Sequence, residues 1–475
     1  MVFNSFVFLV FVALFFALLY PIRRQQNLQL RWGFLVLASF VFYGWWDWRF
    51  LFLILASGFI DFFAALGMRR CPSRKRLLLL LSLAGNIGSL AIFKYAGFLA
   101  GNIDQLLSLA GSSFRLSEHI PEFMLLLPVG ISFYTFQSMS YSIDVYRGRL
   151  QPTGQVLHFF AYLSLFPQLV AGPIVRARDL IPQLRALRPT TETERWNGFR
   201  LIVIGFFKKL VLADNIAPMV NAGFANIHTT QHAGFWWIIM VGFAFQIYFD
   251  FSGYSDIARG LAKWMGLHFR LNFDHPYHAR SLREFWTRWH ISLSTWFRDY
   301  VYIPLGGSAK GPGPAHLFMW ITMLVSGLWH GAAWTFVIWG ALHACCLSVE
   351  RLTKWPSLLR RFPGGGFVSL LLTQTFVLIG WVFFRAESGI DALHILQHMF
   401  RGGPGGFVLS PDIRNGLFWI GMALLIEVLC YFRIKPHRFL PAGMHRMAEL
   451  FYVLLMLLAC IYLRGEGDVF IYFQF

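Results

Sequence analysis

His330 is the residue that most invites a chemical interpretation. It lies within residues 311–349, a stretch of 39 residues that contains no Asp, Glu, Lys or Arg. An ionisable side chain in so apolar a segment is costly in lipid, which makes it a candidate for a functional site. A neutral imidazole is also suited to accept a proton near neutral pH. His330 is therefore the first candidate catalytic residue.

His290 is the second candidate. It lies within residues 284–298, a stretch that is compatible with a single helix on which Glu284 and Arg288 are spaced for an i,i+4 ion pair and two tryptophans share a face. An amphipathic helix at the membrane interface would explain the same pattern without catalysis. From the residues alone, both interpretations remain open.

The other polar residues near these two favour structural roles. On a continuous helix His343 would face nearly opposite to His330, so a hydrogen-bonded structural histidine is expected there. Asp250 and Asp256 flank the end of an apolar run and could orient His330 or bind Arg259, with a structural role favoured. No Cys/His spacing typical of a metal site, glycine-rich phosphate loop or hydrolase motif occurs, so no metal is predicted.

The composition indicates a membrane protein that crosses the bilayer many times with helices. Only 13% of the residues are charged, 57% are hydrophobic and the mean hydropathy is +0.55, whereas soluble domains have about a quarter of charged residues. A closed β-barrel would show short alternating segments instead. The net charge of +18 is explained by Lys and Arg in cytoplasmic loops, and no nucleic-acid partner is predicted.

Basic loops predict the sidedness of the chain. Residues 21–31 and 69–76 are rich in Arg and should be cytoplasmic. The aromatic residues 45–49 should then form the outer turn of the intervening hairpin, with the N-terminus outside. The first apolar run, residues 2–20, lacks a basic start and is expected to be a retained helix.

Further apolar runs bring the prediction to about eleven or twelve spans. The run 156–175 has basic residues on both sides and is broken by Pro167, Gly172 and Pro173, which favours a re-entrant segment shielded by protein. We expect one integral-membrane domain over residues 1–475 with a catalytic core at about 123–350. The remaining predicted spans are 77–93, 123–143, 199–220, 236–251, 367–384, 416–432 and 448–463.

The segment that holds His330 should enter and leave the membrane on one side. A basic stretch from Arg259 to Lys310 precedes it and Glu350 and further basic residues follow it, so both ends are expected in the cytoplasm. Two full crossings need roughly forty helical residues plus a turn, which makes the segment slightly too short. A shallow hairpin or two broken half-helices, turning near His330, would place the imidazole deep in the membrane near the far face.

Four ordered motifs resemble the membrane-bound O-acyltransferase family, and in particular its bacterial branch that contains the membrane subunit of alginate O-acetyltransferase. The segments 383–387 and 470–475 are also similar to that branch, and the resemblance covers nearly the whole chain. The four motifs are Tyr248-Phe-Asp-Phe-Ser-Gly-Tyr-Ser-Asp256, Glu284-Phe-Trp-Thr-Arg-Trp-His-Ile-Ser-Leu-Ser-Thr-Trp296, Arg298-Asp-Tyr-Val-Tyr-Ile-Pro-Leu-Gly-Gly307 and Gly327-Leu-Trp-His-Gly331.

The resemblance implies roles for both histidines. His330 matches the family histidine needed for acyl transfer, and His290 matches a second position that is Asn in many eukaryotic members. The implied fold is a ring of helices with short or re-entrant helices around a thinned centre and a cytoplasmic funnel for the acyl donor. The implied activity is O-acetylation of an exported polysaccharide, alginate first, by a multi-pass protein of the bacterial inner membrane that works with periplasmic acetyltransferase partners.

These implications lead to a mechanistic hypothesis. Acetyl-CoA is the expected donor, and Arg283, Arg288 and Arg298 are candidates to bind its phosphates. His330 would act as general base or carry the acetyl group briefly, and His290 would position or polarise the acyl group. Alternatives are a family enzyme for cellulose, peptidoglycan or teichoic acid (D-alanyl transfer), a transporter or flippase with a proton-relay histidine, and a structural subunit of a secretion complex.

Overall fold

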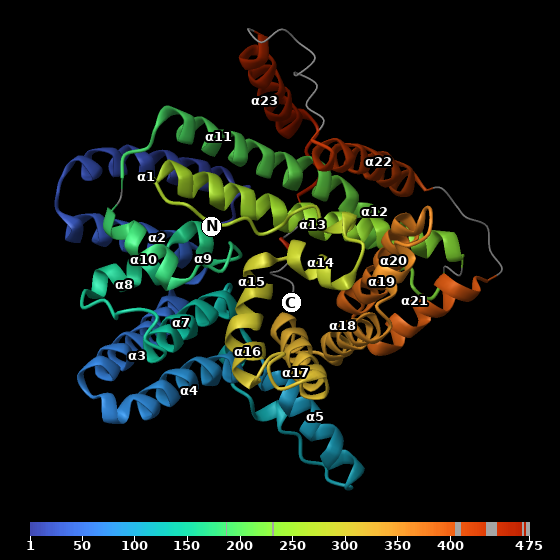
Figure 1. The fold of residues 1–475 in the computed structure, drawn as a ribbon, viewed down its shortest axis with the longest axis horizontal. Coiled ribbons are helices and arrows are strands. Elements are labelled where there is room, and N and C mark those ends of the chain that lie inside the picture. The colour runs from blue at the N-terminus through green and yellow to red at the C-terminus, as the bar shows by residue number, and fades with distance from the viewer. Residues whose placement is uncertain (187, 230–231, 404–409, 434–443, 468–469, 472–475) are drawn as a thin grey trace. The chain divides into compact units, whose positions relative to one another are not determined.

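The computed structural model describes residues 1–186, 188–229, 232–403, 410–433, 444–467 and 470–471, and these residues form helices and connecting segments with no strand (Figure 1). The predicted all-helical fold is confirmed. The chain divides into two compact units. The first comprises residues 1–199 and 258–270, and the second comprises residues 200–257 and 271–475.

Eight helical segments among the described residues are long and apolar enough to cross a membrane. Leu28–Arg70 is long enough for two crossings. A 3₁₀ turn at Trp48–Phe50 divides it into α2 (Leu28–Asp47) and α3 (Leu51–Arg70), at the predicted outer turn. Any further crossings would be made by shorter helices. The other seven segments are Phe6–Arg24, Pro72–Phe93, Ala233–Trp264, Trp334–Thr353, Gly365–Arg385, Pro411–Tyr431 and His445–Tyr462.

The first unit is organised around a buried carboxylate. In it α3, α4 (Lys75–Phe93) and α7 (Ile131–Tyr146) pack together, and Asp61 of α3 accepts hydrogen bonds from three serines and Asn86. Four donors satisfy both carboxylate oxygens, which a buried charge requires. Helix α7 begins at Ile131, after Gly130 at a φ of 78°, so the predicted span from residue 123 starts too early.

The predicted re-entrant segment is interrupted as expected. Its first eight residues form α8 (Val156–Leu163), the single turn α9 (Phe166–Leu169) follows, and the chain then runs without regular structure to α10 (Ala177–Ala186). Residues 158–177 are all buried. Irregular backbone at membrane depth requires such shielding by protein.

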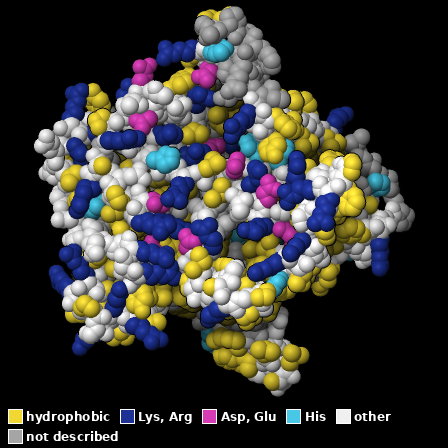
Figure 2. Space-filling view, in the orientation of Figure 1, with side chains coloured by type: hydrophobic (Ala, Val, Ile, Leu, Met, Phe, Trp, Pro, Cys, Tyr) yellow, Lys and Arg dark blue, Asp and Glu magenta, His cyan; other side chains and the backbone are white. Residues whose placement is uncertain are grey.

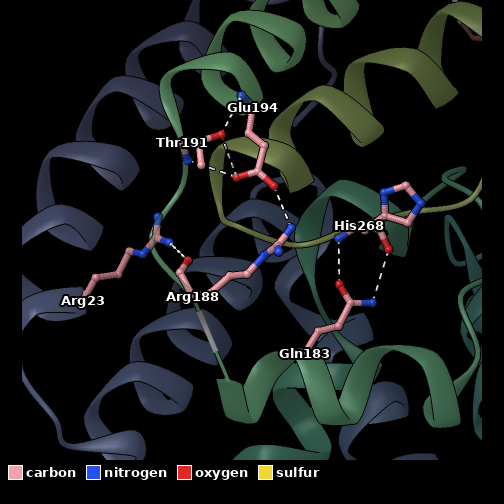
Figure 3. Close-up of polar contacts among 6 residues, drawn as sticks. All are labelled: Arg23, Gln183, Arg188, Thr191, Glu194 and His268. Carbon is pink, nitrogen blue, oxygen red and sulfur yellow. Dashed lines mark hydrogen bonds and ion pairs between the residues drawn. The ribbon is translucent and has the colours of Figure 1, made fainter.

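A capping box starts α11 (Glu192–Phe206) in the first unit (Figure 3). The Thr191 hydroxyl accepts from the Glu194 backbone N–H at 3.2 Å, and the Glu194 carboxylate accepts from the Thr191 backbone N–H at 3.0 Å. Arg188 donates to the same carboxylate at 2.6 Å, and Arg23 donates to the Arg188 carbonyl. The pKa of Glu194 is lowered, first because its charge accepts the Thr191 N–H.

The segment after α13 (Ala233–Trp264) is held to α10 by a reciprocal pair of hydrogen bonds (Figure 3). Gln183 accepts from the His268 backbone N–H at 2.7 Å and donates to the His268 carbonyl at 3.3 Å. Arg270 adds an ion pair with Asp179 at 3.2 Å. Side chains therefore fix this irregular segment within the first unit.

A π-helical turn, Phe207–Ala213, joins α11 to α12 (Asp214–Ala225) and explains two lysines inside an apolar run. Lys209 bridges Asp214 at 2.8 Å and Asp250 at 2.9 Å, and all three side chains are almost fully buried. Lys208 pairs with Asp256 at 2.7 Å. Asp250 and Asp256 thus pair with lysines of the π-helical turn, partners that the sequence did not indicate.

The apolar hairpin of the second unit is formed by α17 (Pro312–His330) and α18 (Trp334–Thr353). Its turn at residues 331–333 lies where the sequence predicts it. Each helix is uninterrupted, with 19 and 20 residues, or roughly 30 Å at the rise of an α-helix. Of the two expected forms, the structure has the hairpin, and the broken half-helices are wrong because both helices run without interruption.

The remaining helices complete the two units. In the second unit, α18 packs on α20 and α12 packs on α22. The bounds are α1 (Phe6–Arg24), α5 (Ala96–Leu109), α6 (Glu122–Leu125), α14 (Leu282–Arg288), α15 (Ile291–Phe297), α16 (Ile303–Leu305), α19 (Trp355–Leu359), α20 (Gly365–Arg385), α21 (Gly389–Arg401), α22 (Pro411–Tyr431) and α23 (His445–Tyr462).

The surface combines the two features expected of a membrane protein. Long helices carry large exposed apolar side chains, such as Phe6 and Leu14 on α1 and Phe451 and Ile461 on α23, which suit contact with lipid. On the face shown in Figure 2, Lys and Arg side chains outnumber Asp and Glu side chains, as they do in the whole sequence, 41 against 23. The basic excess is thus displayed on the surface.

Candidate active site

His330 is the last residue of α17 and is enclosed by aromatic rings. Only 4% of its surface is exposed. The imidazole meets Trp329, Trp339 and Phe384 edge to face, at ring-centroid distances of 5.0, 5.0 and 5.2 Å. Rings of three helices therefore shield this side chain from water, and a proton-accepting group so enclosed can act on a bound substrate without competing solvent.

The turn after His330 allows this enclosure because it contains no side chain at its tightest point. A Cβ atom on Gly331 would lie 2.0 Å from the Phe336 ring, which itself packs on Phe384 at 5.1 Å. Trp334, which follows the turn, is exposed, whereas Trp329 before it is buried. Phe384 and Trp339 supply the rest of the wall.

His290 lies at a break between two helices, so the single helix expected over residues 284–298 is wrong. Helix α14 ends at Arg288, and His290 has φ 41° and ψ 55° before α15 begins. This left-handed conformation is uncommon for any residue except Gly. The predicted pair of Glu284 with Arg288 is confirmed at 2.9 Å. The break turns the imidazole into the core, where it is fully buried.

Trp329 links the two candidate histidines. Its ring centroid lies 5.0 Å from that of His330 and 6.2 Å from that of His290. Phe251 of α13 packs edge to face on His290 at 4.7 Å. Burial lowers the pKa of His290 to about 3, so its imidazole is neutral at physiological pH. The structure thus brings His330 and His290 into contact with one buried ring.

Asn272 is a further polar residue at this place and is fully buried. Its side-chain oxygen lies 3.3 Å from His290 Nδ1 and accepts from the Ser292 backbone N–H at 3.1 Å and the Ser292 hydroxyl at 2.8 Å. Its side-chain nitrogen donates to Ser255 at 3.2 Å. No sequence motif singled out Asn272, because its burial depends on packing that the sequence does not show.

His343 lies closer to the candidate site than the sequence predicts. Because the turn at residue 331 separates α17 from α18, His343 shares the Trp339 ring with His330, at centroid distances of 4.6 and 5.0 Å. Trp286 of α14 also packs on His343, at 5.2 Å. The expectation of opposite faces assumed one continuous helix and is wrong for that reason.

Comparison with known proteins identifies the fold and its chemistry. The model of the membrane-bound O-acyltransferase (MBOAT) family matches residues 153–386, a range that contains both histidines. A protein of Pseudomonas putida named as a probable alginate O-acetylase is 40% identical over 435 residues, which are 90% of this chain and 85% of that relative. The chain belongs to the membrane-bound O-acyltransferase family. It is therefore an acyltransferase and a multi-pass membrane protein.

Relatives with other acceptors match this MBOAT enzyme less closely. A peptidoglycan O-acetyltransferase of Helicobacter pylori is 35% identical and aligns over 77% of this chain and 73% of its own length. A teichoic acid D-alanyltransferase of Bacillus subtilis is 27% identical, over 57% of this chain and 71% of that relative. The sequence identity to the relative named for alginate is thus higher than the identity to the relatives named for peptidoglycan and teichoic acid.

The three arginines proposed to bind donor phosphates differ in their surroundings in this MBOAT chain. Arg288 pairs with Glu284, and Arg298 pairs with Asp299 at 2.7 Å. Arg283 on α14 has an exposed side chain. Its backbone N–H donates to Glu350 at 3.4 Å, so a carboxylate lies near each of the three arginines.

The end of the described chain also reaches the surroundings of His290. Phe470 packs on Phe251 at 5.9 Å, and the Ile471 backbone N–H donates to Asp250 at 2.7 Å. Both residues are buried. Residues 472–475 of the predicted terminal motif lie outside the described residues. The motif was recognised in the sequence, but its burial beside Phe251 was not predicted.

No group of three or more His, Cys, Asp or Glu side chains in the described part of the chain is arranged to hold a metal ion. On α21, the Nε2 atoms of His394 and His398 lie 3.3 Å apart. The chemistry that the candidate site offers from its own residues is that of two buried imidazoles among aromatic rings.

Proposed function

We propose that this MBOAT enzyme moves acetyl groups from a cytoplasmic donor across the bacterial inner membrane for O-acetylation of exported alginate. The observation that supports the proposal is the 40% identity to a probable alginate O-acetylase over 90% of the chain. The matched sequence includes both buried histidines, which pack on Trp329. Acceptors of the more distant relatives, peptidoglycan and teichoic acid, are less favoured because identity to those proteins is lower.

In the proposed reaction, His330 takes the proton of the attacking hydroxyl. The hydroxyl oxygen forms a bond to the thioester carbonyl carbon, the carbon–sulfur bond breaks, and the thiolate leaves with the proton that the imidazole accepted. An acetyl group held transiently on the His330 ring is the second route. In both, the aromatic wall of Trp329, Trp339 and Phe384 keeps water from the thioester.

Acetyl-CoA is the proposed donor. Guanidinium groups suit its phosphates because they offer paired N–H donors and a permanent charge. Arg283 would make the first contact, and Arg288 and Arg298 would join after exchanging their carboxylate partners. A thioester also matches the proposed acid–base chemistry, since its thiolate is a good leaving group.

We further propose that periplasmic acetyltransferase proteins complete the transfer to the polymer. A membrane enzyme that accepts acetyl groups from the cytoplasm needs an acceptor on the outer side, and a protein partner there would carry the group to alginate. Within the bilayer, lipid would contact the exposed apolar surface of the long helices.

The test is complementation of an alginate-producing bacterium that lacks its own O-acetylase. Wild-type protein should restore ester-linked acetate on secreted alginate, measured by release with base. His330→Ala should reduce this acetate by about 100-fold or more, since the loss of a general base costs 10²–10⁴-fold. Labelled acetyl-CoA supplied to membrane vesicles should transfer its label to partner protein or polymer.

A matched histidine variant separates chemistry from folding. His119→Ala changes an exposed side chain of the first unit and should leave acetylation unchanged. Equal protein levels of the two variants in the membrane are required for the comparison. Normal acetylation by His330→Ala would refute the assignment, and acetate on peptidoglycan in place of alginate would refute the acceptor.

A further inference from the structure

We propose that Asn272 is a positioning residue that fixes His290 in the tautomer with the proton on Nδ1, so that Nε2 presents a lone pair to the reacting groups. This inference deepens the proposed function and rests on it for its catalytic meaning. Its structural content stands on hydrogen bonds alone. Those bonds decide the orientation of the Asn272 amide first and the tautomer of His290 second.

The orientation of the Asn272 amide follows from a backbone donor. The Ser292 N–H can only donate, so the Asn272 atom that faces it at 3.1 Å must be the oxygen. The amide nitrogen then faces the Ser255 hydroxyl at 3.2 Å, which can accept. Exchanging the two atoms would set N–H against N–H at Ser292. The amide is therefore assigned by its contacts.

The tautomer of His290 follows from that oxygen. Asn272 Oδ1 has no hydrogen, and it lies 3.3 Å from His290 Nδ1. A lone pair on Nδ1 would point at a lone pair on oxygen, whereas an Nδ1–H would form a hydrogen bond. The Ser292 hydroxyl gives its hydrogen to the same oxygen at 2.8 Å and lies 3.5 Å from Nδ1, where it can only accept. Both neighbours favour a proton on Nδ1.

The backbone of the loop holds Asn272 in place for this task. His290 is the residue before α15, and its left-handed backbone leaves it unable to cap the helix with its own side chain. The Ile291 N–H donates instead to the Asn272 carbonyl at 2.8 Å. Asn272 thus accepts hydrogen bonds from the first two N–H groups of α15, although it lies outside the helix. These two bonds fix the distance between the Asn272 side chain and the His290 imidazole.

This tautomer selects between two roles for His290. A neutral imidazole with its proton on Nδ1 cannot donate a hydrogen bond from Nε2, so it cannot polarise the carbonyl of an acyl group. It can accept a hydrogen bond from a hydroxyl, or its proton. The structure therefore assigns His290 the role of an acceptor at Nε2: on the route in which His330 carries the acetyl group, His290 accepts the proton of the attacking hydroxyl. The expectation from the sequence that it polarises the acyl group is not supported by this geometry.

The direct test is nitrogen-15 NMR on protein labelled at histidine, with the His290 signals identified by their loss in His290→Gln. The Nδ1 signal should have the shift of a protonated nitrogen and the Nε2 signal that of a bare one. The reverse pattern would overturn the proposal, whether or not the protein acetylates alginate. Failure of the inference is thereby distinguished from failure of the proposed function.

Two substitutions test the catalytic meaning in membrane vesicles. Asn272→Leu removes the acceptor and should lower acetyl transfer by about 100-fold. Asn272→Asp keeps an oxygen for both Ser292 groups, and the Ser255 hydroxyl can turn to donate to it. Its added charge should raise the pKa of His290, because a carboxylate favours the imidazolium. Activity should then be retained near pH 8 and fall towards pH 5 more steeply than that of the wild-type enzyme.

A residue that only caps α15 would give a different result, because aspartate caps helices as well as asparagine does. Asn272→Asp would then follow the wild-type pH profile, which would overturn the catalytic role. The groups packed around His290 are Phe251 from α13, Phe273 and Asn272 from the preceding loop, Trp329 from α17 and Ser292 from α15. Asn226→Asp, which adds the same charge at an exposed position, is the matched control.

Discussion

Gly327 should be required for activity far more than for stability. It lies where α17 crosses α18, and a Cβ atom at this position would be 2.3 Å from the Phe336 carbonyl oxygen. A Cβ on Gly340, from the opposite helix, would be 2.5 Å from the Met323 carbonyl oxygen. The two backbones thus touch, as small residues permit at helix crossings in membranes. Gly327→Ala must push the helices apart.

The required shift can be worked out from these distances. Ordinary contact begins near 3.4 Å, so the helices must separate by about 1 Å. His330 belongs to one helix and Trp339 to the other, with ring centroids 5.0 Å apart. A displacement of about 1 Å at a reacting group can cost about 100-fold in rate. Overpacking costs about 1–3 kcal/mol, partly offset by about 1 kcal/mol from the better helix propensity of alanine.

Acetate on secreted alginate and thermal unfolding of the purified protein measure the two effects separately. Gly327→Ala should lose most acetylation while unfolding within a few degrees of wild type. Gly421→Ala is the matched control, because this glycine is exposed on α22 and no atom lies within 4 Å of its would-be Cβ; it should acetylate normally. Wild-type acetylation by Gly327→Ala would refute the reasoning that this crossing sets the geometry around His330.

Three further changes test separate parts of the structure. Lys209→Met should destabilise the protein by about 3–5 kcal/mol in thermal unfolding, since it leaves two buried carboxylates without their cation. Thr191→Ala should cost about 1 kcal/mol by removing the capping box. The contribution of Glu194, whose pKa is lowered by that box, is present above the ordinary pKa of a glutamate and should be lost as pH falls through the lower folded value. Arg283→Ala should raise KM for acetyl-CoA about tenfold with unchanged kcat, as expected for uniform binding.

Each of these changes has a neighbouring control. Lys208→Met breaks a more exposed ion pair, since 20% of the Lys208 side chain is exposed against 11% of the Lys209 side chain. An equal loss of stability from both substitutions would contradict the burial argument. Glu192→Gln, in the same first turn as Glu194, should keep the wild-type dependence of stability on pH. Arg361→Ala removes an exposed charge elsewhere, and a matching rise in KM would mean that net charge, and not Arg283, binds the donor.

The sequence predicted the parts of the fold that depend on hydrophobicity and on local backbone chemistry. The long apolar runs became helices, and the turn after His330 lies where two glycines flank the histidine. The interruption of residues 156–175 followed from its prolines and glycine. Such features need only neighbouring residues, so a single chain reveals them.

Features that depend on partners distant in sequence were not predictable from the chain alone. The break at His290 is stabilised by Asn272, eighteen residues earlier, so local helix propensity gave the wrong result there. The position of Lys209 in an apolar run is explained by its ion pairs with the carboxylates of Asp214 and Asp250. His343 was assigned to the wrong face because one glycine turn, once formed, resets the direction of every later residue on α18.

The left-handed backbone at residue 290 narrows the amino acids that evolution can place there. Apart from glycine, the residues that tolerate this conformation best are Asn, Asp and His. The resemblance implies His at this position in the bacterial branch and Asn in many eukaryotic members, and both belong to that short set. Glycine would relieve about 1–2 kcal/mol of strain but would offer no group for chemistry. The backbone of this loop therefore limits which residue types can serve at position 290, independently of any substrate.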